Sequence, residues 1–201
     1  MAETTRSAAL ALADERALMR QGYRFLDEKR MLLAAEMLRR LADHGRLEAQ
    51  LLEALHAARA ALRLALRRHG LEGLQAYPPA RKAPEAVAPT RSLFLGVPLL
   101  AVASAAPVPV PAEAPDAVDA SPEAEACRAA FAALLAPLLR LAVEGGNLER
   151  LGAEYRRTER RARALENVLL PEIEAALVRI EDHLERADQE EAVRIRLAAR
   201  R

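Results

Sequence analysis

The sequence predicts an all-α protein: a long antiparallel two-helix coiled coil, built from the N- and C-terminal helices, with a Pro-rich middle insert that contains a short β-hairpin. Hydrophobic residues make up 52% of the 201 residues but aromatic residues only 3%. Such a composition suits a thin seam between helices better than a thick globular core. Ten of the twelve prolines lie between residues 78 and 122, which confines long helices to the two sides of that segment.

The first predicted segment, residues 1–69, is an N-terminal helix whose apolar residues form one seam. Most of them recur every seven positions, which is the pattern of a face that packs on a single partner helix. The seam residues are Leu12, Met19, Tyr23, Leu26 and Leu33. Ser7 is the expected N-cap, and Gly22 inside the helix indicates close approach of a neighbouring backbone. About 60 helical residues would reach roughly 90 Å.

The second segment, residues 70–122, is Pro/Ala-rich and begins where Gly70 and Gly73 close the helix. Two apolar runs flank Gly96-Val97-Pro98 and predict a short hairpin there. Each proline removes a backbone donor and fixes φ, so from Pro78 to Pro122 we expect no helix longer than two turns and the hairpin as the only regular element.

A middle helix, residues 123–144, follows the predicted N-cap Ser121 and Pro122 at the first helical position. Pro137 should kink this helix, and Gly145-Gly146-Asn147 should end it.

The last segment, residues 147–201, is the second long helix, and Pro171 should bend it or loosen one hydrogen bond without ending it. Its stripe alternates spacings of three and four from Leu148 onward, with one added residue after Leu169, and then resumes. The proposed seam residues are Leu165, Leu169, Ile173, Ile180 and Leu184. If both chain ends lie at one end of the pair, the numbers of opposed residues should add up to roughly 200, within one heptad.

The sequence contains no recognisable arrangement of catalytic residues. The sequence has no phosphate-binding Gly-Lys loop, its four histidines lack metal-ligand spacing, and its single cysteine, Cys127, fits a small buried side chain. We therefore expect no cofactor, no metal and no enzymatic activity. The net charge of +1 gives no case for nucleic acid, and prolines interrupt the uncharged run from Ser92 to Ala112, which argues against membrane insertion.

One electrostatic feature stands out in the last helix, and we call it the arginine band. Its net charge is +4 once Glu159 is included. The band consists of Arg156, Arg157, Arg160, Arg161 and Arg163. Two interpretations are open: a solvated helix flank with ion pairs along the helix, or a positive surface that contacts acidic loops of a partner.

Two separated stretches resemble the D-subunit family of V/A-type (vacuolar/archaeal-type) ATPases. Residues Arg20 to Arg30 resemble its N-terminal signature, and Arg160 to Pro171 followed by Glu172-Ile173-Glu174-Ala175 resemble its C-terminal signature. Thr5-Arg6-Ser7 is similar to the opening of the family, whereas the Pro/Ala-rich stretch and the residues from Gln189 to Arg196 depart from it.

The resemblance implies the central rotor shaft, or axle, of an ATPase or ATP synthase that moves H⁺ or Na⁺. Its end helices would stand within the head of catalytic and nucleotide-holding subunits. Its middle would contact a small rotor protein, the F subunit, and the funnel-shaped subunit that connects the shaft to the membrane ring. The location implied is cytoplasmic, peripheral at the inner face of the membrane.

Two alternatives remain at this point. A cytoplasmic homodimeric coiled-coil adaptor would pair helices between chains, whereas an axle pairs its own two ends. A basic amphipathic helix lying on a membrane would need bulky apolar residues opposite a Lys/Arg face, and the Ala-rich stripes argue against it.

Overall fold

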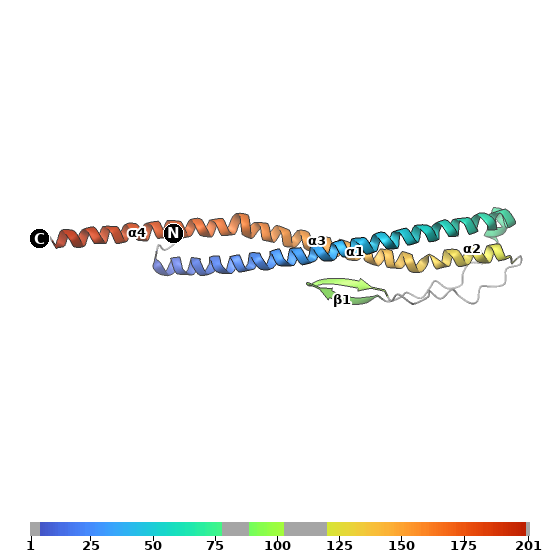
Figure 1. The fold of residues 1–201 in the computed structure, drawn as a ribbon, viewed down its shortest axis with the longest axis horizontal. Helices are drawn as coiled ribbons and strands as arrows, with labels where there is room; N and C mark the ends of the chain where they lie inside the picture. Colours follow the sequence, from blue (N-terminus) through green and yellow to red (C-terminus); the bar gives the residue numbers. More distant parts are fainter. Residues whose placement is uncertain (1–4, 78–88, 103–119, 200–201) are drawn as a thin grey trace. The chain divides into compact units, whose positions relative to one another are not determined.

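The computed structural model describes residues 5–77, 89–102 and 120–199, and these residues are mostly helical (Figure 1). The elements, in chain order, are α1 Arg6–Gln75, β1 Thr90–Phe94, β2 Val97–Ala101, α2 Pro122–Ala133, α3 Leu135–Ala164, a π-helical turn η1 Leu165–Leu169, and α4 Leu170–Ala198. The chain forms two compact units. We call residues 1–34 and 154–201 the end unit, and residues 35–153 the middle unit.

Helix α1 begins slightly earlier than the sequence suggested. Thr5, not Ser7, caps it: the Thr5 hydroxyl accepts a hydrogen bond from the Ala8 amide at 3.2 Å. The helix passes through Gly45 without a break. At Gly70 the backbone leaves helical geometry, with φ 68° and ψ 177°, a region that side chains with a Cβ avoid.

The predicted hairpin is confirmed within the described part of the insert. Strands β1 and β2 pair antiparallel, from Phe94 opposite Val97 to Thr90 opposite Ala101. The two-residue loop between them has positive φ at both positions, 50° at Leu95 and 86° at Gly96, as in a type I′ turn. Its flanks, residues 78–88 and 103–119, lie outside the described residues.

Helix α2 starts as predicted. The Ser121 hydroxyl accepts a hydrogen bond from the Ala124 amide at 3.2 Å, and Pro122 occupies the first turn. Helices α2 and α3 are separated at Leu134, although its backbone keeps helical angles, φ −71° and ψ −23°. Pro137, three residues further on, has no amide hydrogen to donate back.

The break expected at Gly145-Gly146-Asn147 does not occur, since α3 runs continuously from Leu135 to Ala164. The cost of two glycines in a helix is about 2 kcal/mol, which tertiary contacts can offset. Asn147 makes such contacts, because its side chain is fully buried and bonded to the hairpin.

The prediction for Pro171 is confirmed, because helix continues on both sides of it. The preceding turn, η1, is π-helical, and the Leu170 amide bonds back to the Leu165 carbonyl five residues away. A π-turn inserts one residue into an α-helix. The extra residue predicted after Leu169 therefore lies directly beyond this turn, which ends at Leu169.

In the end unit, the first part of α1 packs antiparallel to the chain from Glu154 onward (Figure 1). Ion pairs join Arg6 to Asp188, Arg20 to Glu174, and Lys29 to Glu154. The paired numbers add up to between 183 and 194, so the expected total of 200 was too high and only the outer pairs fall within a heptad of it. The continuation of α4 for ten residues beyond Asp188 lowers the total of the two outer pairs below 200.

In the middle unit, the two sides of the insert are joined at its ends. The Ser121 amide donates to the Tyr77 hydroxyl at 3.0 Å, and the Ser121 hydroxyl lies 2.5 Å from His69 Nε2. Further along, Arg40 pairs with Glu144 at 2.7 Å. Two small residues of α1, Ala58 and Ala65, are fully buried in this unit.

Candidate functional site: partner-contact surfaces

The two stretches that resemble a family signature pack against each other in the end unit. A Cβ built on Gly22 would lie 3.8 Å from Leu165 Cδ1, which is an ordinary van der Waals contact. Gly22 is therefore not required by a tight backbone approach, and that part of the sequence interpretation was wrong. Burial raises the pKa of the Tyr23 phenol above its ordinary value, and the Glu166 carboxylate raises it further.

The proposed seam residues differ in how far the structure buries them. On α1, Leu33 is fully buried, and Leu12, Met19, Tyr23 and Leu26 are half-buried. On the other helix, Ile173 and Ile180 are buried, Leu165 and Leu184 are half-buried, and Leu169 is exposed. The exposed position lies at the end of η1, where the extra residue rotates the following side chains relative to the preceding stripe.

The stripe predicted from Leu148 onward contains three further residues that the structure buries: Leu151, Thr158 and Ala162. Their spacing of three and four residues placed them on the buried face of the helix. Leu177 is also buried and was missed, although it lies four residues after Ile173 and three before Ile180, which is helical spacing.

A second apolar stripe on α1 points away from the seam, and we call it the outer stripe. It consists of Leu18, Phe25 and Leu32, which are 63%, 65% and 48% exposed. These residues also recur every seven positions, one position before Met19, Leu26 and Leu33. Residues one apart on a helix point about 100° away from each other, so the two stripes face different directions.

Every member of the arginine band is exposed. The buried positions between them, Thr158 and Ala162, face the partner helix. Arg163 pairs with Glu159 at 2.7 Å within the band. The band therefore presents positive charge to solvent from one flank of α3.

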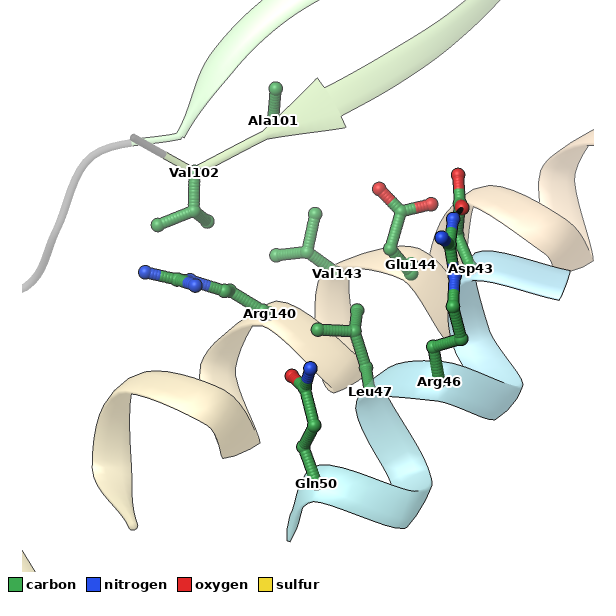
Figure 2. A pocket seen from close by; sticks show the side chains of 9 residues that line it. All are labelled: Asp43, Arg46, Leu47, Gln50, Ala101, Val102, Arg140, Val143 and Glu144. Carbon is green, nitrogen blue, oxygen red and sulfur yellow. Dashed lines mark hydrogen bonds and ion pairs between the residues drawn. The ribbon is translucent and has the colours of Figure 1, made fainter. Parts of the chain in front are cut away.

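A cavity of about 420 Å³ lies in the middle unit, where the end of β2 meets α1 and α3. Figure 2 shows Ala101 and Val102 on one side, facing Leu47 and Val143 from the two helices. Its carboxylates are engaged locally: Asp43 pairs with Arg46 and with Arg39, and Glu144 pairs with Arg40. The described residues that line it include no Ser, Thr, Cys or His, so this lining offers no nucleophile with a neighbouring base.

Near this cavity, α1 carries a cluster of paired charges around Glu36. Hydrogen bonds from Arg39 and then Arg40 lower the pKa of the Glu36 carboxyl from 4.5 to about 2, against the opposing effect of burial.

Among the residues that the structure describes, no group of three or more His, Cys, Asp or Glu side chains is placed to hold a metal ion. Burial raises the pKa of the half-buried Cys127 thiol, which favours its neutral form.

Fold and surface together define a class: a helical protein in which two long helices pack antiparallel, with a two-stranded hairpin in the middle of the chain and exposed apolar and arginine rows. The family model described as the ATP synthase D subunit matches residues 8–200. The chain belongs to the D-subunit family of V-type ATP synthases.

Individual relatives match along almost the whole chain. The V-type ATP synthase D subunit of Anaeromyxobacter dehalogenans (strain 2CP-1) is 39% identical over 202 residues, covering 97% of this chain and 94% of the relative. The D subunit of Anaeromyxobacter sp. (strain Fw109-5) is 36% identical over 206 residues, with 98% and 93% covered. The D subunit of Thermotoga neapolitana is 28% identical over 193 residues, with 96% and 94% covered.

Proposed function

We propose that this chain is the central rotor axle of a V-type rotary ATPase or ATP synthase and is itself non-catalytic. It would transmit torque between the head that hydrolyses or makes ATP and the membrane ring that moves H⁺ or Na⁺. Residues 1–69 and 147–201 would form the shaft. Residues 70–122 and the helix at 123–144 would form the part nearer the membrane.

The observation that carries this proposal is the meeting of the two signature stretches within one unit. Residues more than a hundred positions apart contact each other there, through the ion pair Arg20–Glu174 and through a hydrogen bond between the Tyr23 and Glu166 side chains. A shaft must resist sliding of one helix along the other, and three ion pairs along the seam oppose such a slip. An axle requires its two end helices to pair within one chain, whereas a homodimeric adaptor pairs helices between two chains.

The outer stripe and the arginine band are the surfaces we assign to contact with the catalytic and nucleotide-holding subunits of the head. An apolar row can slide past apolar loops without a fixed hydrogen-bond geometry. Exposed ion pairs are worth about 0–1 kcal/mol each, so a positive band can guide acidic loops without trapping one rotational position. The small F subunit of the rotor and the funnel-shaped subunit would contact the middle unit.

The location we propose is cytoplasmic and peripheral to the membrane. One 18-residue window within Pro122–Ala198 has a mean hydropathy of 1.7 and meets the length and composition of a membrane span, with 11% of it buried. Paired helices rich in Ala and Leu meet the same criterion. Pro137 and the charged Arg128 and Arg140 in this region argue for packing on other protein helices.

The test is a charge reversal of three band residues, Arg156→Glu, Arg160→Glu and Arg163→Glu, in the complete complex. We expect the isolated chain to stay folded, because all three side chains are exposed, while assembly or the coupling of ATP hydrolysis to ion flow weakens. The matched control reverses three exposed arginines further along the C-terminal helix, at positions 179, 186 and 194. It makes the same change in net charge and should have the smaller effect.

Equal behaviour of the two triple variants would return the band to a solvated helix flank. The rotor proposal itself is tested separately, by the mass of the purified chain in solution and by its companions in complexes isolated from native membranes. A monomer that copurifies with ATPase head subunits supports the axle. A stable homodimer without those companions would support the adaptor instead.

A further inference from the structure

Among the residues that the structure describes, Asn147 is the one residue of α3 whose side chain bonds to both backbone polar groups of a hairpin residue. Its Oδ1 accepts from the Leu100 amide at 2.8 Å, and its Nδ2 donates to the Leu100 carbonyl at 2.7 Å. The side chain is fully buried. A buried carboxamide with both ends bonded has one fixed orientation, and Arg150 Nη1 reinforces it by donating to Oδ1 at 3.2 Å.

The hairpin register explains why Leu100 needs a partner. A two-residue loop makes Phe94 and Val97 a hydrogen-bonded pair, so narrow and wide pairs alternate away from it. Leu100, opposite Arg91, then occupies a position whose amide and carbonyl point away from β1. The other such position on β2 is Pro98, which has no amide hydrogen. Asn147 therefore stands where a third strand would bond.

Strand β2 is also the strand with buried side chains. Val97 and Leu99 are 4% and 3% exposed, whereas β1 is exposed from Thr90 to Leu93. Apolar burial holds a surface without fixing its position along the neighbour, since it has no direction. Two hydrogen bonds to one residue fix the position of its backbone to within a fraction of a residue.

We propose that the Asn147 carboxamide is a latch that positions the hairpin on α3 by acting as a one-residue third strand for Leu100. Asn147 is a positioning residue: it sets where β2 sits, and through β2 it sets where the exposed β1 edge and the turn at Leu95 and Gly96 project. This role is independent of the rotor proposal. The two hydrogen bonds also explain why Asn147 lies inside a continuous helix, although Gly-Gly-Asn is typical of a helix end.

The experiment is hydrogen exchange resolved to individual amides in the full chain, with Asn147→Ala, Asn147→Asp and the control Asn167→Ala. Asn167 is the only other asparagine and is exposed. In Asn147→Ala the Leu100 amide should exchange at least about tenfold faster, and the rest of β2 should follow, while amides of α1 and α3 keep their protection. Asn167→Ala should leave the hairpin unchanged.

Asn147→Asp separates the latch from simple core packing. At neutral pH the carboxylate can accept from the Leu100 amide but repels its carbonyl, so protection should be partly lost. Below the pKa of the new carboxyl, its proton restores a donor, and Leu100 protection relative to the original protein at the same pH should recover. Unchanged Leu100 exchange in Asn147→Ala overturns the proposal. If that variant unfolds throughout, absence of acid recovery in Asn147→Asp overturns it, and recovery supports it.

Discussion

The ion pair between Lys29 and Glu154 should contribute measurably to holding the end unit together. Lys29 Nζ lies 2.6 Å from Glu154 Oε1, and the side chains are only 19% and 24% exposed. Hydrogen bonds to charged groups contribute about 1.5–3 kcal/mol, and the cost of removing both ions from water brings the net to the lower end, about 1.5 kcal/mol. A double-mutant cycle with Lys29→Met and Glu154→Gln should measure a coupling energy of that size.

The matched control is the pair Arg6–Asp188, which joins the same two sides of the end unit at 3.0 Å with side chains 77% and 66% exposed. Its cycle should give at most about 0.5 kcal/mol. Urea unfolding followed by far-UV circular dichroism yields both couplings, and a rise in salt should erase the second more completely than the first. Equal couplings for the two pairs, or less than about 0.5 kcal/mol for Lys29–Glu154, would refute the argument that partial burial gives this pair its strength.

Three further predictions follow from local geometry. Gly145→Ala and Gly146→Ala should each raise the free energy of unfolding by about 1 kcal/mol, because an added Cβ at either site meets only ordinary contacts; a loss of stability in thermal unfolding would contradict this. Leu95→Asn should stabilise the hairpin by about 1 kcal/mol, because Asn tolerates positive φ better than Leu, and slower exchange of the hairpin amides is the measurement. Glu36→Gln should destabilise the protein at neutral pH. The pKa of Glu36 is lowered on folding, so its contribution to the free energy of unfolding is present above about pH 4.5 and is lost as pH falls toward 2. The free energies of unfolding of the two proteins, measured in urea, should therefore converge across that window. A constant difference would show that the hydrogen bonds from Arg39 are not the source of this contribution.

Elements that depend on neighbouring residues could be predicted from the sequence. Pro122 and Ser121 begin α2 because a hydroxyl cap and a fixed φ act on the nearest turn. Gly96 permits the hairpin loop because its φ of 86° is unavailable to most residues. Helix continues through Pro171 as predicted, and the residue added to the stripe after Leu169 lies next to a π-turn, which the sequence did not predict. Each of these features depends on a few neighbouring residues.

Which apolar stripe is buried, how the helices are offset and whether a glycine pair ends a helix depend on tertiary contacts. Periodicity of seven fits Met19, Leu26 and Leu33, but it fits Leu18, Phe25 and Leu32 equally, and only a partner helix distinguishes an inner from an outer stripe. The offset between the helices is likewise read only from contacts such as Arg20–Glu174 and Lys29–Glu154, because no repeat encodes it. Gly145-Gly146-Asn147 carries the composition of a helix end, yet it remains helical, because the buried amide of Asn147 finds both its partners on a strand 47 residues away. Local propensity amounts to about 1 kcal/mol per residue, so contacts of this kind can override it wherever the fold brings them together.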